Sequence, residues 1–318
     1  MTSPTLGKTL IIANPASRSG RGADATRFVE RFLSAYDSAT DSFEVCRTRS
    51  SGDATIRATQ ARGYDSLIVL GGDGIIHETV CGLMRLDREL RPALGIIPMG
   101  SGNDFARSLG MVLNEPQTAL SQIMSGEARP CDIGRVNVRD TGELTYFVET
   151  LSFGVDAAIA LDTTARRAGG SRQEGASLFA TSGVKLFSHA QKGWPYAASF
   201  DGGEPISGRE IIFAVQNGPT YGGGFKIAPD AIVNDGLLDV CLNTRVPHVA
   251  HALALFAKAR SGRHVESRVV RTLKARSIDV RFEGEVPPCQ VDGEGLTGSH
   301  FAIDVMPAEL RLIWPGRL

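Results

Sequence analysis

The first 130 residues alternate between short apolar runs and stretches with helical spacing of apolar positions. Apolar runs of this length predict buried strands, and apolar residues three and four apart predict helices that pack against a core. Regular alternation of the two predicts βαβ units and a parallel sheet. We expect strands at 9–13, 43–46, 66–70 and 94–97, and helices at 28–36, 53–62, 75–86 and 116–126.

The pattern changes after Cys131, where short strands with alternating polarity dominate. This predicts a second, mainly antiparallel β domain that resembles a sandwich and carries a few helices. We therefore expect an α/β domain at 1–130 and a β-rich domain at 131–318, with the C-terminal residues packing back on the first. Strands are expected at 133–138, 145–152, 196–200, 210–215, 237–242, 277–282 and 300–305, and helices near 156–166, 176–189 and 247–260.

Composition excludes several classes of protein. The 318 residues carry a formal net charge of -1, so bulk charge gives no reason to expect nucleic acid as a partner. The five cysteines form no CxxC pair, which disfavours a zinc ribbon or a disulfide framework and fits a reducing cytoplasm. No apolar run approaches the roughly 20 residues of a membrane helix, so contact with lipid would be peripheral.

Three glycine-containing turns follow strands of the predicted parallel sheet, at 14–22, 71–74 and 98–104. Loops at the carboxyl ends of parallel strands gather at one edge of the sheet, where helix amides can hold phosphate. None of them is a GxGxxG or GxxxxGK[ST] motif. A single such turn could serve as a simple reversal of the chain, but three at one edge favour a phosphate site.

Two of these turns carry an acid, Asp73 and Asp104. A carboxylate beside a polyphosphate becomes favourable when Mg²⁺ lies between them, and it can also accept a proton from an attacking hydroxyl. Both roles suit phosphoryl transfer. The alternative is that the two acids cap helices, which fits Asp104 better than Asp73.

The sequences GGDGIIHETVCGL (71–83) and LGIIPMGSGNDFARSLG (94–110) resemble the catalytic domain of the diacylglycerol kinase and sphingosine kinase family, particularly its bacterial soluble lipid kinases. The loop NPASRSGRG, the turn RTRSSGDA and the later segments NGPTYGGGFKIAPDAIVNDGLLDV and QVDGE agree with that family. GGDG alone is shared with NAD kinases and phosphofructokinases, so the combination carries the resemblance.

The resemblance implies an ATP site between the two domains, with Mg²⁺ managed by Asp73 and Asp104. The family threonine after GGDG is replaced by Ile75, which removes a hydroxyl but keeps the backbone amide. The residues expected to contact nucleotide are Asn14, Thr48, Gly72, Asp73, Gly74, Ile75, Ile76, His77, Glu78 and Ser101.

The resemblance also assigns a proton acceptor to the VDGE turn. Glu294 occupies that position, and Asp292 is so near that the sequence leaves their roles open; a polar hairpin without catalytic function is the alternative. The loop AIVNDGL resembles a second, structural Mg²⁺ or Ca²⁺ site, with the carboxylate of Asp235 and the carbonyls of Ile232 and Leu237 as ligands.

These observations predict a lipid kinase that moves the γ-phosphoryl of ATP to a diacylglycerol-like hydroxyl, at a peripheral membrane position and in an undefined oligomeric state. Two alternatives remain, a kinase for a soluble nucleotide or sugar and a catalytically silent binding protein. Seven cations between residues 258 and 276 could attract anionic headgroups, or could form an ordinary solvated face.

Overall fold

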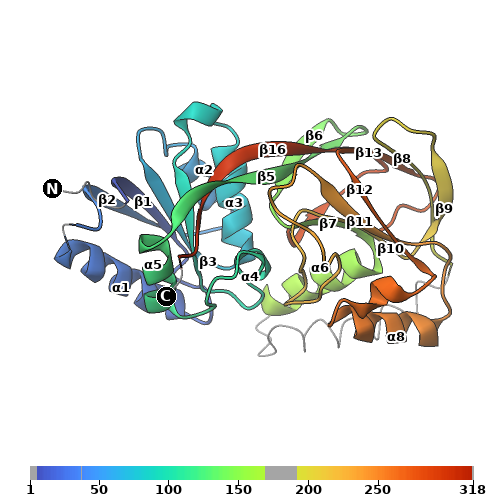
Figure 1. Ribbon diagram of the computed structural model, residues 1–318, viewed down its shortest axis with the longest axis horizontal. Helices are drawn as coiled ribbons and strands as arrows, with labels where there is room; N and C mark the ends of the chain where they lie inside the picture. The colour runs from blue at the N-terminus through green and yellow to red at the C-terminus, as the bar shows by residue number, and fades with distance from the viewer. Residues whose placement is uncertain (1–5, 37, 169–191, 317–318) are drawn as a thin grey trace. The chain divides into compact units, whose positions relative to one another are not determined.

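The computed structural model describes residues 6–36, 38–168 and 192–316 (Figure 1). Internal contacts group the chain into two units, each with its own secondary structure. Unit 1 comprises Met1–Cys131 and Ala308–Leu318, and unit 2 comprises Asp132–Pro307.

Unit 1 is built on a parallel sheet in the order β2-β1-β3-β4. Every residue of β3 and β4 is buried, as expected for central strands that are covered on both faces. The end of the last strand of the chain, β16, joins this sheet in parallel through Leu312 beside Leu94. The strands are β1 (Lys8–Ala13), β2 (Ser42–Arg47), β3 (Ser66–Gly71), β4 (Ala93–Pro98) and β16 (His300–Trp314).

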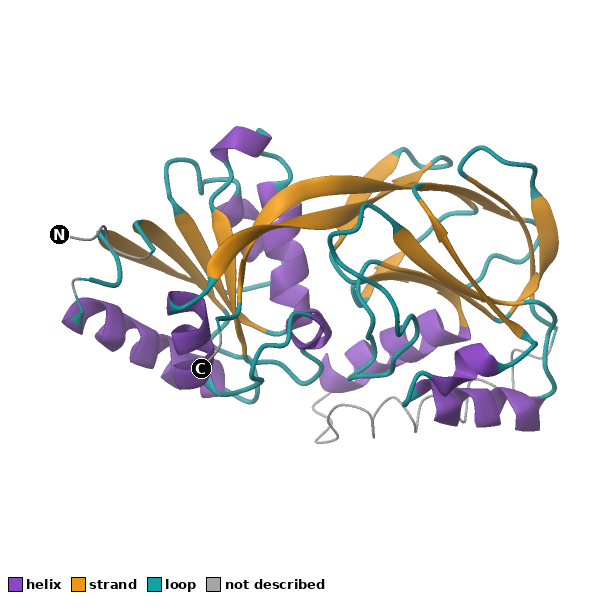
Figure 2. Ribbon diagram, in the orientation of Figure 1, coloured by secondary structure: helices purple, strands orange, loops and turns teal. Residues whose placement is uncertain are grey.

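Helices cover both faces of this sheet (Figure 2). Helix α1 packs with α5, and α2 packs with α3. Each of these four was predicted, whereas α4 was not, because five residues are too few to show a helical period. The helices are α1 (Arg21–Ala35), α2 (Asp53–Ala58), α3 (Asp73–Leu83), α4 (Asp104–Ser108) and α5 (Pro116–Met124), with a 3₁₀ turn at Arg88–Leu90.

Unit 2 contains antiparallel strands in two sheets. In one, β13 lies between β16 and β8, β9 pairs with β8, and β5 pairs with β6. These strands are β5 (Glu127–Val138), β6 (Glu143–Phe147), β8 (Trp194–Phe200), β9 (Ile206–Glu210) and β13 (Ser277–Phe282).

The other sheet has the order β12-β11-β10-β7-β14-β15. Phe153 lies at the centre of the core that the two sheets share, with its ring 4.8 Å from that of Phe301 and 5.0 Å from that of Phe282. The strands are β7 (Thr150–Gly154), β10 (Ile212–Gln216), β11 (Leu238–Asn243), β12 (Val270–Ala275), β14 (Cys289–Val291) and β15 (Glu294–Leu296). The mixed α/β class, with a parallel sheet first and antiparallel sheets second, is confirmed.

Among the residues of unit 2 that the structure describes, two helices and a 3₁₀ turn accompany the sheets. They are α6 (Val155–Ala168), α8 (Val249–Ala259) and η2 (Arg263–Glu266). The helix predicted at 176–189 lies outside the described residues. No helix among the described residues is both long enough and apolar enough to cross a membrane.

Some predicted boundaries in unit 2 were wrong. The expected strand at 145–152 is two strands, because the amides of Val148 and Glu149 between them donate to Asp292 rather than to a neighbouring strand. The strand expected at 300–305 continues to Trp314, passing a left-handed residue at Ala308 (φ 53°). Strands β9 and β12 were not predicted, since their alternation of polarity is weak.

Candidate functional site

The turns that follow β3 and β4 lie in direct contact. The amide of Met99 donates to the carbonyl of Gly71 at 2.7 Å. A Cβ on Gly100 would lie 2.4 Å from the Cα of Gly72, so only glycine allows the two backbones this approach. The two turns expected at one edge of the sheet therefore form a single structure.

Asn103 closes the second turn, and sequence analysis did not single it out. Its backbone is left-handed (φ 53°) and its side chain is fully buried. The side-chain nitrogen donates to the carbonyl of Gly100 at 2.9 Å, and the side-chain oxygen accepts the Gly100 amide at 2.8 Å. The signal available in the sequence was an asparagine directly before the acid that begins α4, because asparagine tolerates a left-handed backbone.

The carboxylates of Asp73 and Asp104 converge on Gly102. A Cβ on Gly102 would lie 2.8 Å from Oδ2 of Asp73 and 3.2 Å from Oδ2 of Asp104. Burial first, and the charge of Asp104 second, raise the pKa of Asp73 to about 7, while the backbone amide of Phe105 donates to Asp73 at 3.4 Å. Each of these acids disfavours ionisation of the other, and a shared proton or a cation would relieve this.

This pair fits a magnesium ion that also binds phosphate. Mg²⁺ uses one or two protein carboxylates and takes its other ligands from water and substrate. Among the described residues, no cluster of three or more His, Cys, Asp or Glu side chains could hold a metal alone. Asp73 and Asp104 would therefore be joined by no third such side chain of the described residues in holding an ion.

Two further turns of unit 1 lie beside neighbouring strands. The amide of Asn14 donates to the carbonyl of Leu70 at 2.9 Å, at the end of β3. The amide of Thr48 donates to the carbonyl of Ala13 at 2.8 Å, and its hydroxyl lies 3.3 Å from the same oxygen. Asn14, Thr48 and the Gly71–Gly72 turn thus lie at the same edge of the sheet. Ser101, three residues before Asp104 in the chain, is half-buried.

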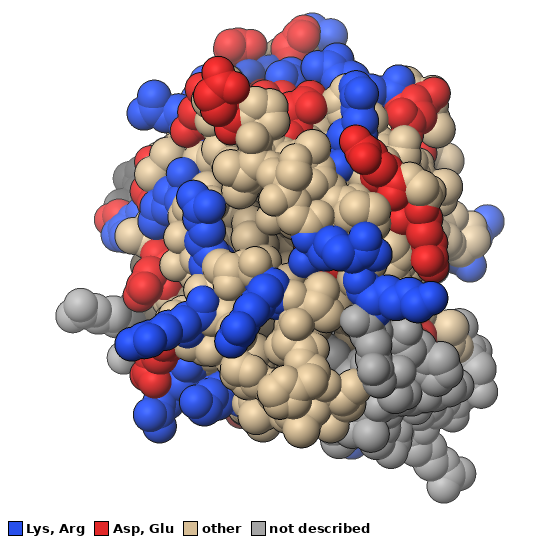
Figure 3. All heavy atoms as spheres, turned by 90° about the vertical axis from the view of Figure 1, so that its right-hand side faces the viewer, with Lys and Arg blue, Asp and Glu red and all other residues tan. Residues whose placement is uncertain are grey.

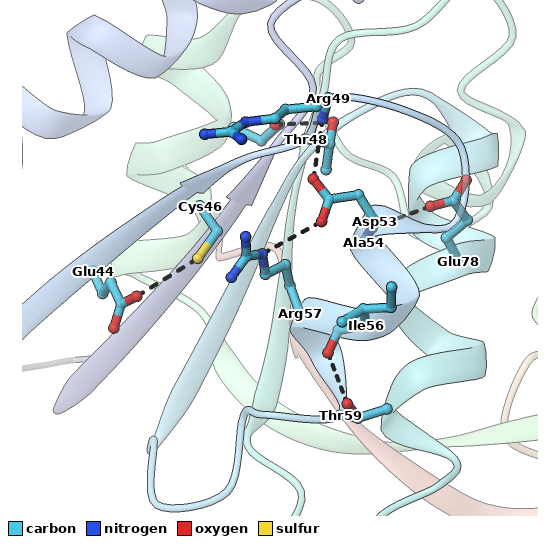
Figure 4. A network of polar contacts seen from close by, with 11 residues as sticks. Glu44, Cys46, Thr48, Arg49, Asp53, Ala54, Ile56, Arg57, Thr59 and Glu78 are labelled. Carbon is cyan, nitrogen blue, oxygen red and sulfur yellow. Dashed lines mark hydrogen bonds and ion pairs between the residues drawn. The ribbon is translucent and has the colours of Figure 1, made fainter.

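Glu78 is occupied within the protein (Figure 4). Its carboxylate accepts the amide of Ala54 at 3.2 Å and the hydroxyl of Ser51 at 3.1 Å, at the start of α2. Asp53 holds the preceding turn by accepting the amide of Arg49 at 3.1 Å (Figure 4). Glu78 therefore supports the loop that carries Thr48.

The remaining residues of the GGDG turn differ in exposure. Gly74 is exposed, whereas the side chains of Ile75, Ile76 and His77 are buried. The hydrocarbon of Ile75 lies against Gly71, where a Cβ would approach within 2.5 Å of Cγ2 of Ile75. Gly74 has no side chain and the other three are buried, so this part of the turn presents no exposed side chain to a ligand.

The VDGE turn of unit 2 separates its two acids by role. Asp292 is buried with a left-handed backbone (φ 46°), and its carboxylate accepts the amides of Val148, Glu149 and Thr150 at 2.8–3.1 Å. Glu294 is exposed at the start of β15. Asp292 therefore fastens the turn to the β6–β7 connection, and Glu294 is the acid that a ligand can reach.

The loop at Asp235 is held by protein groups. Oδ1 of Asp235 accepts the amide of Leu237 at 3.1 Å, and Oδ2 lies 2.8 Å from Nζ of Lys274. The carbonyl of Ile232 accepts the Asp235 amide at 3.4 Å. Because Lys274 already neutralises the carboxylate, this arrangement does not fit a divalent cation, and the second ion stays a prediction.

Unit 2 also contains an apolar pocket between β10, β11 and α8. Its free volume is about 60 Å³, and its lining includes Ile211, Leu255, Phe256 and Val270. Asp156 is a polar residue in this wall, and burial raises its pKa to about 7. Such a lining suits a hydrocarbon chain, although a long chain would require α8 or its side chains to move outward.

Two family descriptions match the chain. Residues 8–136 match "Diacylglycerol kinase catalytic domain", and residues 149–314 match "YegS C-terminal NAD kinase beta sandwich-like domain". The chain belongs to the diacylglycerol kinase catalytic-domain family.

Named relatives agree with this membership. The chain is 30% identical over 286 residues to "Diacylglycerol kinase" of Bacillus subtilis (strain 168), covering 89% of this chain and 88% of that one. It is 30% identical over 271 residues to "Probable lipid kinase YegS-like" of Serratia proteamaculans (strain 568), covering 82% and 80%.

Solved structures share the fold. A diacylglycerol kinase from Bacillus anthracis str. Sterne superimposes with a TM-score of 0.69 at 21% identity, over 99% of this chain and 98% of that one. Yeast NADH kinase, solved with NADH, gives 0.53 at 12% identity, over 100% and 85%. At these identities the likeness concerns the fold alone.

Proposed function

We propose that this protein transfers the γ-phosphoryl group of ATP to a hydroxyl group of a lipid. Family membership supports a kinase, and the names of the bacterial relatives support a lipid acceptor. The observation that carries the proposal is the convergence of Asp73 and Asp104 on Gly102, in the turns that follow β3 and β4. This arrangement suits a magnesium-bound triphosphate.

The four acids divide three roles in the proposed reaction. Asp73 and Asp104 would hold Mg²⁺, which when bound offsets the charge on the phosphate oxygens. Glu294 would accept the proton of the acceptor hydroxyl as its oxygen bonds to the γ-phosphorus and the bond to the β-phosphate oxygen breaks, releasing ADP. Asp292 would act as a positioning residue, because three backbone amides already occupy its carboxylate.

The apolar pocket of unit 2 supports a lipid rather than a soluble acceptor. The surface that lines this pocket is mostly hydrocarbon, although Asp156, Tyr221, Asn243 and His264 also belong to the lining. A sugar or nucleotide site would normally present more polar surface. The acceptor's chain would occupy this pocket while its hydroxyl remains outside.

The test is transfer of labelled phosphate from Mg²⁺-ATP to a panel that includes diacylglycerol, other lipid alcohols, NAD⁺ and sugars. We expect labelled lipid, and neither labelled nucleotide nor labelled sugar. Labelled NAD⁺ would favour the soluble-acceptor alternative, and ATP binding without transfer to any acceptor would favour the silent protein.

A further inference from the structure

Five exposed cations of unit 2 belong to segments that hydrogen-bond or pair with one another, and we call them the cationic patch. Two of them are joined directly, because Nε of Arg209 donates to the carbonyl of Lys192 at 2.7 Å. The carbonyl of Arg209 in turn accepts the side-chain amide of Asn243 at 2.9 Å, which links β9 to the end of β11. The members of the patch are Lys192, Arg209, Arg245, Arg268 and Arg271.

The other three members come from the segments beside Asn243. Arg245 follows Thr244, whose amide donates to the carbonyl of Val269 at 2.9 Å and whose hydroxyl lies 3.3 Å from the carbonyl of Arg268. Arg271 stands opposite Leu242 in the β11–β12 pair. Four segments that are far apart in the sequence thus bring their cations together.

The charge of this patch is not neutralised within the described part of the chain, where no ion pair involves any of its five members. Other cations nearby are engaged: Lys274 pairs with Asp235 and Asp239, and Arg263 pairs with Glu266. Figure 3, viewed from the side where β9 and α8 lie in Figure 1, shows Lys and Arg side chains crossing and bordering an uncharged surface.

Helix α8 begins four residues after Arg245 and adds a side with few charges. Its eleven residues, VAHALALFAKA, contain one charged side chain, Lys258. Its exposed positions include Ala250, Ala254 and Ala257, where a helix of a water-facing surface would normally carry polar residues. The opposite side of α8 lines the apolar pocket through Leu255 and Phe256.

The patch also borders the wall of the pocket. Ile211 and Val270 line the pocket, and each lies within two residues of a member of the patch, Arg209 and Arg271 respectively. Positive charge, an apolar helix and an apolar pocket therefore occur together. A nucleic acid or an acidic protein would use the charge, but only a lipid surface would use all three.

We propose that the cationic patch and the outer side of α8 dock onto a bilayer that contains anionic phospholipids. Docking would place the pocket against the membrane that supplies the lipid acceptor. This purpose rests on the proposed lipid kinase activity, whereas the docking itself does not. Cations near an anionic surface are attracted individually, and the attraction is screened by salt.

Charge reversal tests this directly. The full-length variant Arg245→Glu/Arg268→Glu/Arg271→Glu would be compared with wild type for co-sedimentation with vesicles of phosphatidylcholine containing about a quarter phosphatidylglycerol. We expect binding to weaken at least about tenfold, because three cations attracted to the anionic surface are replaced by three acids that it repels. Wild-type binding should also fall as salt increases, and vesicles of phosphatidylcholine alone should bind weakly.

The matched control is Arg31→Glu/Arg62→Glu/Arg85→Glu, three exposed arginines of unit 1. It changes net charge by the same amount and should bind vesicles as wild type does. The variant Arg245→Gln/Arg268→Gln/Arg271→Gln removes charge without adding acids, and thermal unfolding of all variants checks the fold.

Three results would overturn docking: equal binding of the reversed and wild-type proteins, equal binding to neutral and anionic vesicles, or binding to RNA or polyglutamate without binding to vesicles. Phosphorylation of a short-chain lipid alcohol in detergent micelles separates this proposal from the kinase. Docking predicts unchanged turnover there for the reversed variant. Vesicle binding by a wild-type protein that phosphorylates no lipid would instead contradict the proposed function alone.

Discussion

At the scale of single residues, the site depends on acids held where their charge is costly. Asp73 lies beside Asp104, and Gly102 leaves no room for a methyl group between them and its own backbone. The ionised pair is therefore unfavourable in the free protein and favourable with a cation. Both pH and a bound cation should therefore change the ionisation of Asp73.

Asp73→Asn should remove a pH dependence of stability. The folded pKa of Asp73, about 7, lies above the ordinary value of 3.8 for an aspartate, so ionisation opposes folding. The free energy of unfolding of wild type should thus fall between about pH 4 and pH 7 relative to that of the variant, and the difference should persist above pH 7. Denaturant unfolding of both proteins without Mg²⁺ measures it; parallel pH profiles would contradict the assignment.

Gly102→Ala should impair phosphoryl transfer by crowding the two carboxylates. Its Cβ would lie 2.8 Å from Oδ2 of Asp73, so one of the groups must move. We expect a loss of kcat of at least about tenfold, since small displacements at a reacting centre can cost about a hundredfold. Gly203→Ala, where the nearest atom is the Phe200 carbonyl oxygen at 3.1 Å, is the control. Normal turnover in Gly102→Ala would argue against a shared cation.

Glu294 and Asp292 should give opposite results when mutated. Glu294 is exposed, so Glu294→Gln should leave thermal unfolding unchanged. The same variant should lower kcat by about 10²–10⁴, the usual contribution of a general base. Asp292→Ala leaves three amides without their acceptor and should cost about 2–5 kcal/mol of stability. Full activity of Glu294→Gln would remove it from the reaction.

At the scale of elements, strand ends and the turns after them decide where chemistry occurs. Strands β3 and β4 run in register from Ser66 beside Ala93 to Gly71 beside Pro98, so their turns begin at the same level. The β6–β7 connection, by contrast, is interrupted by Asp292 from a distant hairpin. Distant residues are thus brought together in two ways: by backbone pairing, as in β3 and β4, and by side-chain hydrogen bonds, as with Asp292.

Lys274 of β12 should compete with any cation at the Asp235 loop. Its ammonium lies 2.8 Å from Asp235 and 3.2 Å from Asp239, at partly exposed positions. Lys274→Ala should lower stability by no more than about 1 kcal/mol. Adding Mg²⁺ or Ca²⁺ should restore the melting temperature of the variant and change that of wild type little. A wild-type response as large as that of the variant would show that Lys274 does not compete.

At the scale of the whole molecule, the two units carry different chemistry. Unit 1 holds the glycine turns and the acid pair, and unit 2 holds the apolar pocket and the cationic patch. Each unit has its own core, so a ligand of one need not order the other.

Hydrogen exchange should distinguish the ligands of the two units. Mg²⁺-ATP should slow exchange in the turns at 14–22, 71–74 and 98–104, because bound ligand suppresses local opening. A short-chain lipid alcohol should slow exchange in α8 and β11. Protection of α8 by ATP alone, or of the glycine turns by lipid alone, would contradict this division.

The sequence predicted the parts of the fold that depend on local pattern. Short apolar runs predicted β1, β3 and β4, the alternation of Phe43 and Val45 with polar neighbours predicted β2, and helical spacing predicted α1, α3 and α5. The resemblance carried by GGDG, PMGSGND and VDGE identified the family that the comparisons confirm. Local chemistry suffices here because strand burial, helical periodicity and phosphate turns involve residues that are close together in the chain.

Only the tertiary structure shows which residues far apart in the sequence contact one another and which stay exposed. Only the fold shows that Asp292 is fastened by amides from 148–150 while Glu294 stays exposed, and that Lys274 occupies the carboxylate of Asp235. Likewise, three of the seven cations at 258–276, namely Arg260, Arg263 and Lys274, contact other groups of the protein, and the cationic patch draws its members from four separate segments. Hydrogen bonds and ion pairs between residues far apart in sequence leave no periodic signal, so only the folded chain reveals them.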